Sequence, residues 1–146
     1  MASTIASYVL RLDAAALNDF LRGAFGGIPA EKLAVVTAVS PGTARLVQVP
    51  DASNLRPGGI VSGPTLMGLA DVAAYAVVLA HIGPVPMAVT STLSIQFLRG
   101  CTPGPITAEA RLLRLGRRTA VIDVRIWTEA EDRLVAQSTV NYALPK

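Results

Sequence analysis

One apolar stretch with a single charge, residues 66–82, limits most strongly what this chain can fold into. Asp71 is its only formally charged residue, and His81 is the other titratable one. The stretch lies near the lower end of the roughly 17 to 25 residues that span a bilayer. However, an aspartate inside such a span costs about 2.5 to 3.5 kcal/mol on insertion scales. Breakers also flank it, Gly63-Pro64 before and Gly83-Pro84 after. The pattern therefore favours a helix over 64–82, capped by Gly63 and Pro64 and buried on all sides inside a protein.

The residues after this helix change to a period of two, which is typical of strands. Residues 87–98 are expected to form a strand with one apolar face and one polar face. The apolar face contains Val89, Leu93, Ile95 and Phe97, and the polar face contains Thr90, Thr92, Ser94 and Gln96. Three further strands are predicted at 106–115, 119–128 and 133–144. Because short connections join the four strands, we expect them to be antiparallel neighbours in a meander.

The first half of the chain supplies a helix, a hairpin and a loop. Asp13 is expected to cap a helix over 13–26, which ends at a Gly/Pro-rich segment. Pro41-Gly42 separates two β-rich runs, 33–40 and 43–50, and predicts a hairpin. Residues 50–64 contain too many breakers for regular structure. This order predicts one α+β domain over 1–146, in which the long helix packs against one face of an antiparallel sheet.

Composition narrows the function classes. Hydrophobic residues make up 51% and charged residues 16% of the chain, which favours burial of surface against copies of itself. The formal charge of +3 without a block of like charges argues against a nucleic-acid track. A single cysteine and a single histidine argue against disulfides and against a Cys/His metal cluster within one chain. The first 20 residues lack the pattern of a secretory signal, so a cytoplasmic protein is expected.

The long helix also carries the strongest candidate chemistry. The N–H groups of its first turn, near Gly63, lack carbonyl partners within the helix and are suited to bind an oxyanion. Asp71 lies eight residues later, and its carboxylate is suited to act as a general base or a nucleophile. The alternative is a structural aspartate that accepts hydrogen bonds from a neighbouring loop.

Several other side chains have both a functional and a structural interpretation. Tyr75 shares the helix face of Asp71, but a core tyrosine bonded to a backbone carbonyl is the simpler interpretation. His81 is expected near the helix C-terminus as a capping residue, and nothing around Cys101 marks it as a nucleophile. Arginines near strand ends are suited to bind phosphate or are simply solvated: Arg99, Arg114, Arg117 and Arg118. Gly58-Gly59 is only a weak phosphate-loop signal.

The loop, Gly63, the helix with Asp71, "VTSTLSIQFLRG" and "ARLLRLGRR" together resemble the hotdog-fold acyl-CoA thioesterases, in particular the phenylacetate-degradation (PaaI-like) branch. The resemblance covers roughly residues 33–143 and is most specific over 58–99. It implies a long helix wrapped by a curved antiparallel sheet, with two subunits sharing one continuous sheet and active sites across their interface. It also implies an acyl-CoA substrate and paired subunits, so we expect a homodimer or homotetramer. The charge pattern and the aspartate within the helix give no reason to expect a nucleic-acid or membrane partner. No metal is implied, and no cofactor apart from the CoA of the substrate.

The family motif is a histidine, two glycines and, a few residues later, Leu-x-Asp. This sequence has Ser62-Gly63-Pro64 and then Leu69-Ala70-Asp71, so serine replaces the histidine and proline the second glycine. The resemblance implies that Asp71 is the nucleophile or general base and that the Gly63 N–H polarises the thioester carbonyl. The position where many relatives carry asparagine or glutamine aligns with Arg56, and Asn54 lies two residues earlier.

Three hypotheses follow. The first is an acyl-CoA thioester hydrolase, with substrate-binding residues expected among Asn54, Arg56, Ser62, Tyr75, Arg99, Arg117 and Arg118. The second is a non-catalytic acyl-CoA-binding module, suggested by the altered triplet at Ser62-Gly63-Pro64. The third is an acyl-thioester hydratase or dehydratase. It ranks last because such enzymes usually need a histidine beside the acid, and His81 is expected at the far end of the helix.

Overall fold

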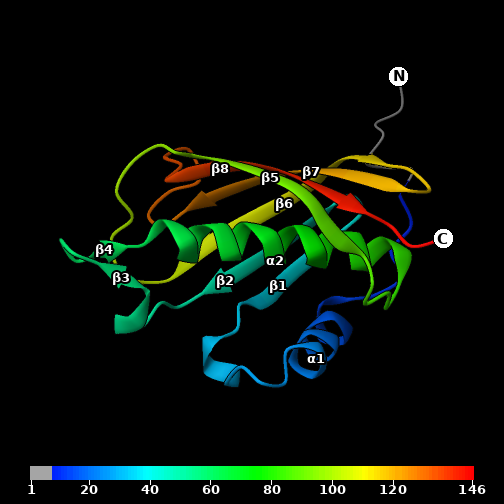
Figure 1. Cartoon of the computed structure of the whole chain (residues 1–146), viewed down its shortest axis with the longest axis horizontal. Coiled ribbons are helices and arrows are strands. Elements are labelled where there is room, and N and C mark those ends of the chain that lie inside the picture. Colours follow the sequence, from blue (N-terminus) through cyan, green and yellow to red (C-terminus); the bar gives the residue numbers. More distant parts are fainter. Residues whose placement is uncertain (1–7) are drawn as a thin grey trace.

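A computed structural model describes residues 8–146 as a curved sheet that wraps around one long helix, α2 (Figure 1). The part of the signal-sequence prediction that rests on residues 1–7 lies outside the described residues. The helices are α1 (Ala14–Ala24) and α2 (Gly63–Ile82), with short 3-10 turns at Ala30–Lys32 and Ala52–Asn54. The strands are β1 (Val35–Ser40), β2 (Thr43–Gln48), β3 (Leu55–Arg56), β4 (Ile60–Val61), β5 (Val89–Phe97), β6 (Ile106–Leu115), β7 (Thr119–Trp127) and β8 (Ala136–Ala143).

The predicted central helix is confirmed as α2, with one correction at its start. Ser62, not Gly63 or Pro64, is the N-cap, and its hydroxyl oxygen accepts a hydrogen bond from the Thr65 N–H at 3.4 Å. Pro64 occupies the first turn, where a missing N–H costs nothing. At the other end Gly83 adopts a φ of 93°, a conformation that favours glycine.

The prediction that α2 is buried on all sides is wrong for its first half. Pro64, Met67 and Gly68 are exposed, and Asp71 is half-buried, whereas Ala73–His81 is buried throughout. By length and composition α2 would suffice to cross a membrane, but 67% of its apolar window is buried inside the protein. The helix forms the core, and its N-terminal half leaves one side open.

The strand order β1-β2-β6-β7-β8-β5 confirms the hairpin and corrects the four-stranded meander. β6, β7 and β8 are successive antiparallel neighbours, but β5 pairs with β8 and not with β6. The eight residues between β5 and β6 can span roughly 26 Å when extended, which is enough to cross two strands spaced about 4.8 Å apart. This connection packs against β4, where the Val61 N–H donates to the Cys101 carbonyl at 2.8 Å. A short connection was therefore not sufficient to imply adjacency.

A register shift in β5 corrects the predicted faces of that strand. The pairing with β8 skips Ser91, so Thr90 lies opposite Tyr142 and Leu93 opposite Val140. One extra residue reverses the side-chain alternation beyond it. Thr90 therefore lies on the inner face with Leu93, Ile95 and Phe97, and Val89 moves to the outer face. As the edge strand, β5 also leaves Val89 and Phe97 about half exposed.

The N-terminal half differs little from the prediction. The Asp13 carboxylate caps α1 by accepting from the Ala16 N–H at 2.9 Å. The loop 50–64 is more regular than expected, since it contains a 3-10 turn and the small β3-β4 sheet. The Gly58 and Gly59 φ angles of 99° and 75° allow the tight turn between these strands. The sequence pattern suggested that these glycines prevent regular structure in the loop, but they make the β3-β4 turn possible.

Candidate active site

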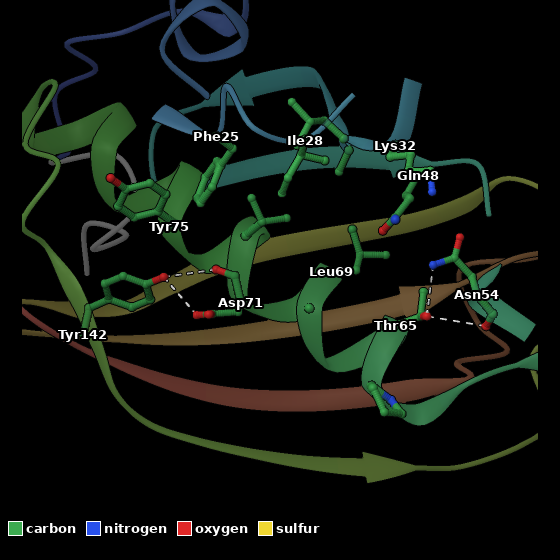
Figure 2. A pocket seen from close by; sticks show the side chains of 15 residues that line it. Phe25, Ile28, Lys32, Gln48, Asn54, Thr65, Leu69, Asp71, Tyr75 and Tyr142 are labelled. Carbon is green, nitrogen blue, oxygen red and sulfur yellow. Dashed lines mark hydrogen bonds between the residues drawn. The ribbon is translucent and has the colours of Figure 1, made fainter. Parts of the chain in front are cut away.

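A cavity of about 330 Å³ runs along the open side of α2, between this helix and the segment that joins α1 to β1. Figure 2 shows Asp71, Tyr75 and Tyr142 at one end, Asn54, Thr65, Gln48 and Lys32 at the other, and Ile28 and Leu69 between them. The lining consists of Phe25, Ile28, Lys32, Leu33, Ala34, Gln48, Asn54, Pro64, Thr65, Gly68, Leu69, Asp71, Val72, Tyr75 and Tyr142. An apolar groove with a few polar groups at its ends is the usual form of a small-molecule site.

Among the described residues that line the cavity, Asp71 alone supplies a carboxylate, and two side chains from the sheet hold it. The Tyr142 hydroxyl donates to Oδ1 at 2.9 Å, and to the Asp71 backbone carbonyl at 3.2 Å. The Thr90 hydroxyl donates to the same Oδ1 at 2.5 Å. Burial raises the pKa of Tyr142 well above its ordinary value, a hydrogen bond with Thr90 partly opposes this effect, and the Asp71 charge adds to it. Tyr142 therefore remains protonated and a donor at neutral pH.

Tyr75 contributes its ring and not its hydroxyl to this end of the cavity. The ring stacks on Tyr142, with centroids 5.9 Å apart and an interplanar angle of 20°, and Phe25 meets it edge-on at 6.3 Å. The Tyr75 hydroxyl donates to the Pro86 carbonyl at 3.2 Å, as in the simpler interpretation of the sequence. The aromatic side chains form a wall beside the carboxylate.

The opposite end of the cavity contains Asn54 but not Arg56. The Asn54 amide nitrogen donates to the Thr65 hydroxyl at 3.3 Å, and its oxygen accepts from the Asp51 N–H at 2.9 Å. Arg56 is exposed and its Nε donates to the neighbouring Pro57 carbonyl. Ser62 is committed to capping α2 and also lies 2.9 Å from the Thr65 hydroxyl.

Gly63 lies outside the cavity lining and away from Asp71. Asp71 lies eight residues after Gly63 in α2, which amounts to about 12 Å along the helix axis. The Gly63 N–H belongs to the first helical turn, where no intrahelical carbonyl reaches it. Phe97 covers the residue closely, since a Cβ at Gly63 would lie 3.3 Å from its ring. The carboxylate and this N–H of one chain therefore cannot contact the same carbonyl group.

The predicted arginines are divided between the two ends of the fold. Arg99 lies near β4 at the start of α2, since the adjacent Gly100 faces Ile60, and its Nε donates to the Leu134 carbonyl at 3.0 Å. Arg117 and Arg118 are exposed in the β6-β7 turn, on the side of the C-terminal end of α2 (Figure 1). The structure does not bring the three arginines together within one chain.

His81 and Cys101 have structural environments. His81 is buried, with Nδ1 2.7 Å from the Val77 carbonyl and Nε2 accepting from the Gly42 N–H. Burial raises the pKa of the Cys101 thiol, which is enclosed in the connection after β5. Within residues 8–146, no three His, Cys, Asp or Glu side chains come together as metal ligands.

Sequence reasoning missed the two side chains that hold Asp71. Strict alternation assigned Thr90 to the outer face, and no local signal marks the extra residue at Ser91. Tyr142 is 71 residues from Asp71, and its strand was predicted without a partner for its hydroxyl. Thr90 could have been found only by testing alternative registers, and Tyr142 only from the tertiary fold.

Comparisons with known proteins agree with this architecture. The sequence model of the thioesterase superfamily matches residues 58–141. A solved structure of a candidate thioesterase from Silicibacter sp. TM1040 is 36% identical, covers 95% of this chain and 96% of its own, and has a TM-score of 0.84. A candidate thioesterase from Ralstonia eutropha JMP134, described as related to phenylacetic acid degradation, is 26% identical over 86% of this chain and 98% of its own, with a TM-score of 0.74.

A third solved relative is a mutant form of the phenylacetic acid degradation protein PaaI from Thermus thermophilus. It is 28% identical, covers 78% of this chain and 95% of its own, and has a TM-score of 0.69. No curated protein matches the chain. The long helix packed against a curved antiparallel sheet is the hotdog arrangement expected from the sequence.

Proposed function

Because this chain belongs to the thioesterase superfamily, we propose that it is an acyl-CoA thioester hydrolase that releases a carboxylic acid and free CoA. The family and its solved relatives support thioester hydrolysis as the reaction class. The CoA portion of the substrate comes from the resemblance to acyl-CoA thioesterases. The observation that carries the proposal is the half-buried Asp71 carboxylate at one end of a largely apolar cavity.

Asp71 is the proposed catalytic carboxylate, and two routes use it. As a general base, it takes a proton from water while the water oxygen bonds to the thioester carbon, and the proton then passes to the departing CoA sulfur. As a nucleophile, it forms an anhydride by expelling the CoA thiolate, and water hydrolyses the anhydride and restores the carboxylate. Neither route needs a metal or a further cofactor.

The Gly63 N–H is the proposed donor to the thioester oxygen, where negative charge develops. Since about 12 Å of helix separates Gly63 from Asp71 in one chain, the proposed site combines Asp71 of one subunit with Gly63 of another. The edge strand β5 supports such an assembly, because its outer edge pairs with no strand within residues 8–146 and apolar side chains near it are exposed. A lone sheet edge of this kind favours pairing with a second copy. We therefore propose a homodimer, or a homotetramer built from it.

We propose substrate-binding roles for the other predicted residues as well. Asn54 and Tyr75 line the cavity and are suited to contact the acyl group. Arg56 and Arg99 lie near the start of α2, whereas Arg117 and Arg118 lie near its other end. Both pairs can therefore contact the phosphates of one CoA only if two subunits together form the binding site. Ser62 serves through the helix cap that presents the Gly63 N–H.

A thiol-release screen over short, long and aromatic acyl-CoAs tests the proposed function. We expect turnover of at least one class, with free CoA and carboxylic acid formed in equal amounts. Tight binding of acyl-CoA by calorimetry without thiol release across the panel would contradict hydrolysis. That result would favour a non-catalytic acyl-CoA-binding module.

A further inference from the structure

The Asp71 carboxylate has two chemically different oxygens in this structure. Both hydrogen bonds that its side chain receives from residues 8–146 end on Oδ1, from Tyr142 at 2.9 Å and from Thr90 at 2.5 Å. Hydrogen bonds to a charged acceptor are roughly twice as strong as neutral ones. Oδ1 is therefore held, and the carboxylate can rotate little about its Cβ–Cγ bond.

Tyr142 is well placed to fix this geometry. The residue is 3% exposed, and its second hydrogen bond, to the Asp71 carbonyl at 3.2 Å, ties it to the helix backbone. Its ring stacks on Tyr75, so the hydroxyl has little freedom to turn away. Figure 2 shows the hydroxyl pointing toward Asp71 from β8.

Thr90 approaches the same oxygen from a different strand because of the register shift in β5. Without the extra residue at Ser91, the Thr90 side chain would lie on the outer face. The shift places it opposite Tyr142, so two strands deliver one donor each to Oδ1. Such a bulge next to a functional group is a common means of redirecting a side chain.

We propose that Tyr142 and Thr90 are positioning residues that hold Oδ1 of Asp71 and leave Oδ2 as the oxygen that removes the water proton or attacks the thioester. This inference rests on the proposed function and deepens it. Neither hydroxyl touches substrate in this role. Each acts by orienting the carboxylate.

The test measures kcat and KM of Tyr142→Phe and Thr90→Val against the wild-type protein. Each substitution removes one hydroxyl and nearly preserves shape, so Oδ1 of Asp71 loses one donor. We expect kcat to fall by about 10- to 100-fold in each variant while KM stays within about twofold, because a misoriented carboxylate slows the chemical step without weakening substrate binding. Thr90→Ser, which retains the hydroxyl, should restore the wild-type kcat, and Tyr8→Phe, which makes the same change outside the cavity, should leave both constants unchanged.

A second readout does not depend on turnover. In crystal structures of Tyr142→Phe and Thr90→Val, the Asp71 carboxylate should turn about its Cβ–Cγ bond or adopt two orientations, whereas Thr90→Ser should keep the wild-type orientation. If the wild-type protein releases no thiol, the proposed function fails, and these structures still decide the positioning role. An unchanged carboxylate orientation in both variants, or a rise in KM without a fall in kcat, would overturn the inference.

Discussion

His81 and Gly42 join the last turn of α2 to the turn of the first hairpin. The Gly42 N–H donates to Nε2 of His81 at 2.9 Å, while Nδ1 lies 2.7 Å from the Val77 carbonyl. Both ring nitrogens are thus used by a neutral imidazole with its proton on Nδ1. A second proton on Nε2 would remove the acceptor that Gly42 needs.

This contact predicts that the protein is less stable in mild acid. Burial lowers the pKa of His81 in the folded state below its ordinary 6.5, against a smaller opposite effect of the Val77 carbonyl. Below about pH 6.5 the unfolded chain binds a proton that the folded chain does not. The free energy of unfolding should therefore fall as the pH decreases from about 6.5 to the folded-state pKa, by at most about 1.4 kcal/mol per pH unit.

Urea denaturation between pH 5 and 8 at fixed protein concentration measures this slope. Since the chain has a single histidine, His81→Gln should flatten it in the window below 6.5. An equally steep slope in that variant would show that another group is responsible.

Asn18 predicts a stability effect at the other edge of the sheet. Its amide nitrogen donates to the Val36 carbonyl at 3.0 Å, and its oxygen accepts from the Val36 N–H at 2.8 Å. The side chain thus pairs with the edge strand β1 as a neighbouring strand would. Asn18→Ala should lower the free energy of unfolding by about 1 to 3 kcal/mol. Asn18→Asp keeps the acceptor oxygen but loses the donor, so its free energy of unfolding should lie between those of the wild type and Asn18→Ala. Equal denaturation midpoints for all three proteins would show that Asn18 does not stabilise β1.

Local patterns were sufficient to predict much of this fold. The apolar stretch with its single charge predicted α2, the Asp13 cap predicted α1, and Pro41-Gly42 predicted the hairpin, because each depends on residues close in sequence. Asp71 was singled out as a candidate site residue for the same reason, as the one carboxylate in an apolar helix, and it lies in the cavity lining. In each case the residues that form the feature are close in sequence, so the pattern that predicts it can be read locally.

The parts of the fold and of the candidate site that were not predicted depend on contacts between residues far apart in the sequence. Eight residues between β5 and β6 suit either a neighbouring strand or a crossing, so the place of β5 beside β8 was not predictable from length. The extra residue at Ser91 has no signature, and Thr90 was assigned to the wrong face. Gly63 and Asp71 were placed at one site although helix geometry holds them apart within a chain, and the positions of Arg117 and Arg118 depend on which end of the sheet their turn occupies.

Asp71→Asn should abolish most of the hydrolysis and preserve the fold. Asparagine Oδ1 can still accept from Tyr142 and Thr90, so packing is retained, but the amide can neither take a proton from water nor attack a thioester. We expect kcat to fall by at least about 100-fold. Thiol release measures the loss, with circular dichroism and size-exclusion chromatography as controls for fold and assembly. Activity close to wild type would remove Asp71 from the mechanism.

The Gly63 N–H can be tested with a matched pair of variants. Gly63→Ala and Gly63→Pro both place a Cβ against the Phe97 ring, but only proline removes the N–H. Proline is tolerated in the first helical turn, and Ser62 already has the extended backbone that precedes proline. Relative to Gly63→Ala, Gly63→Pro should lower kcat by about 100- to 1,000-fold. Equal rates for the two variants would exclude the N–H as the oxyanion donor.

The most direct measurement mixes Asp71→Asn with Gly63→Pro and follows thiol release after subunit exchange. If each site takes Asp71 from one subunit and Gly63 from its partner, a mixed dimer contains one intact site and one doubly altered site. Random exchange should then restore about a quarter of wild-type activity, since half of the dimers are mixed and each has one working site. A mixture that remains as inactive as its components, although mass spectrometry shows that mixed dimers have formed, would contradict a site built from two subunits.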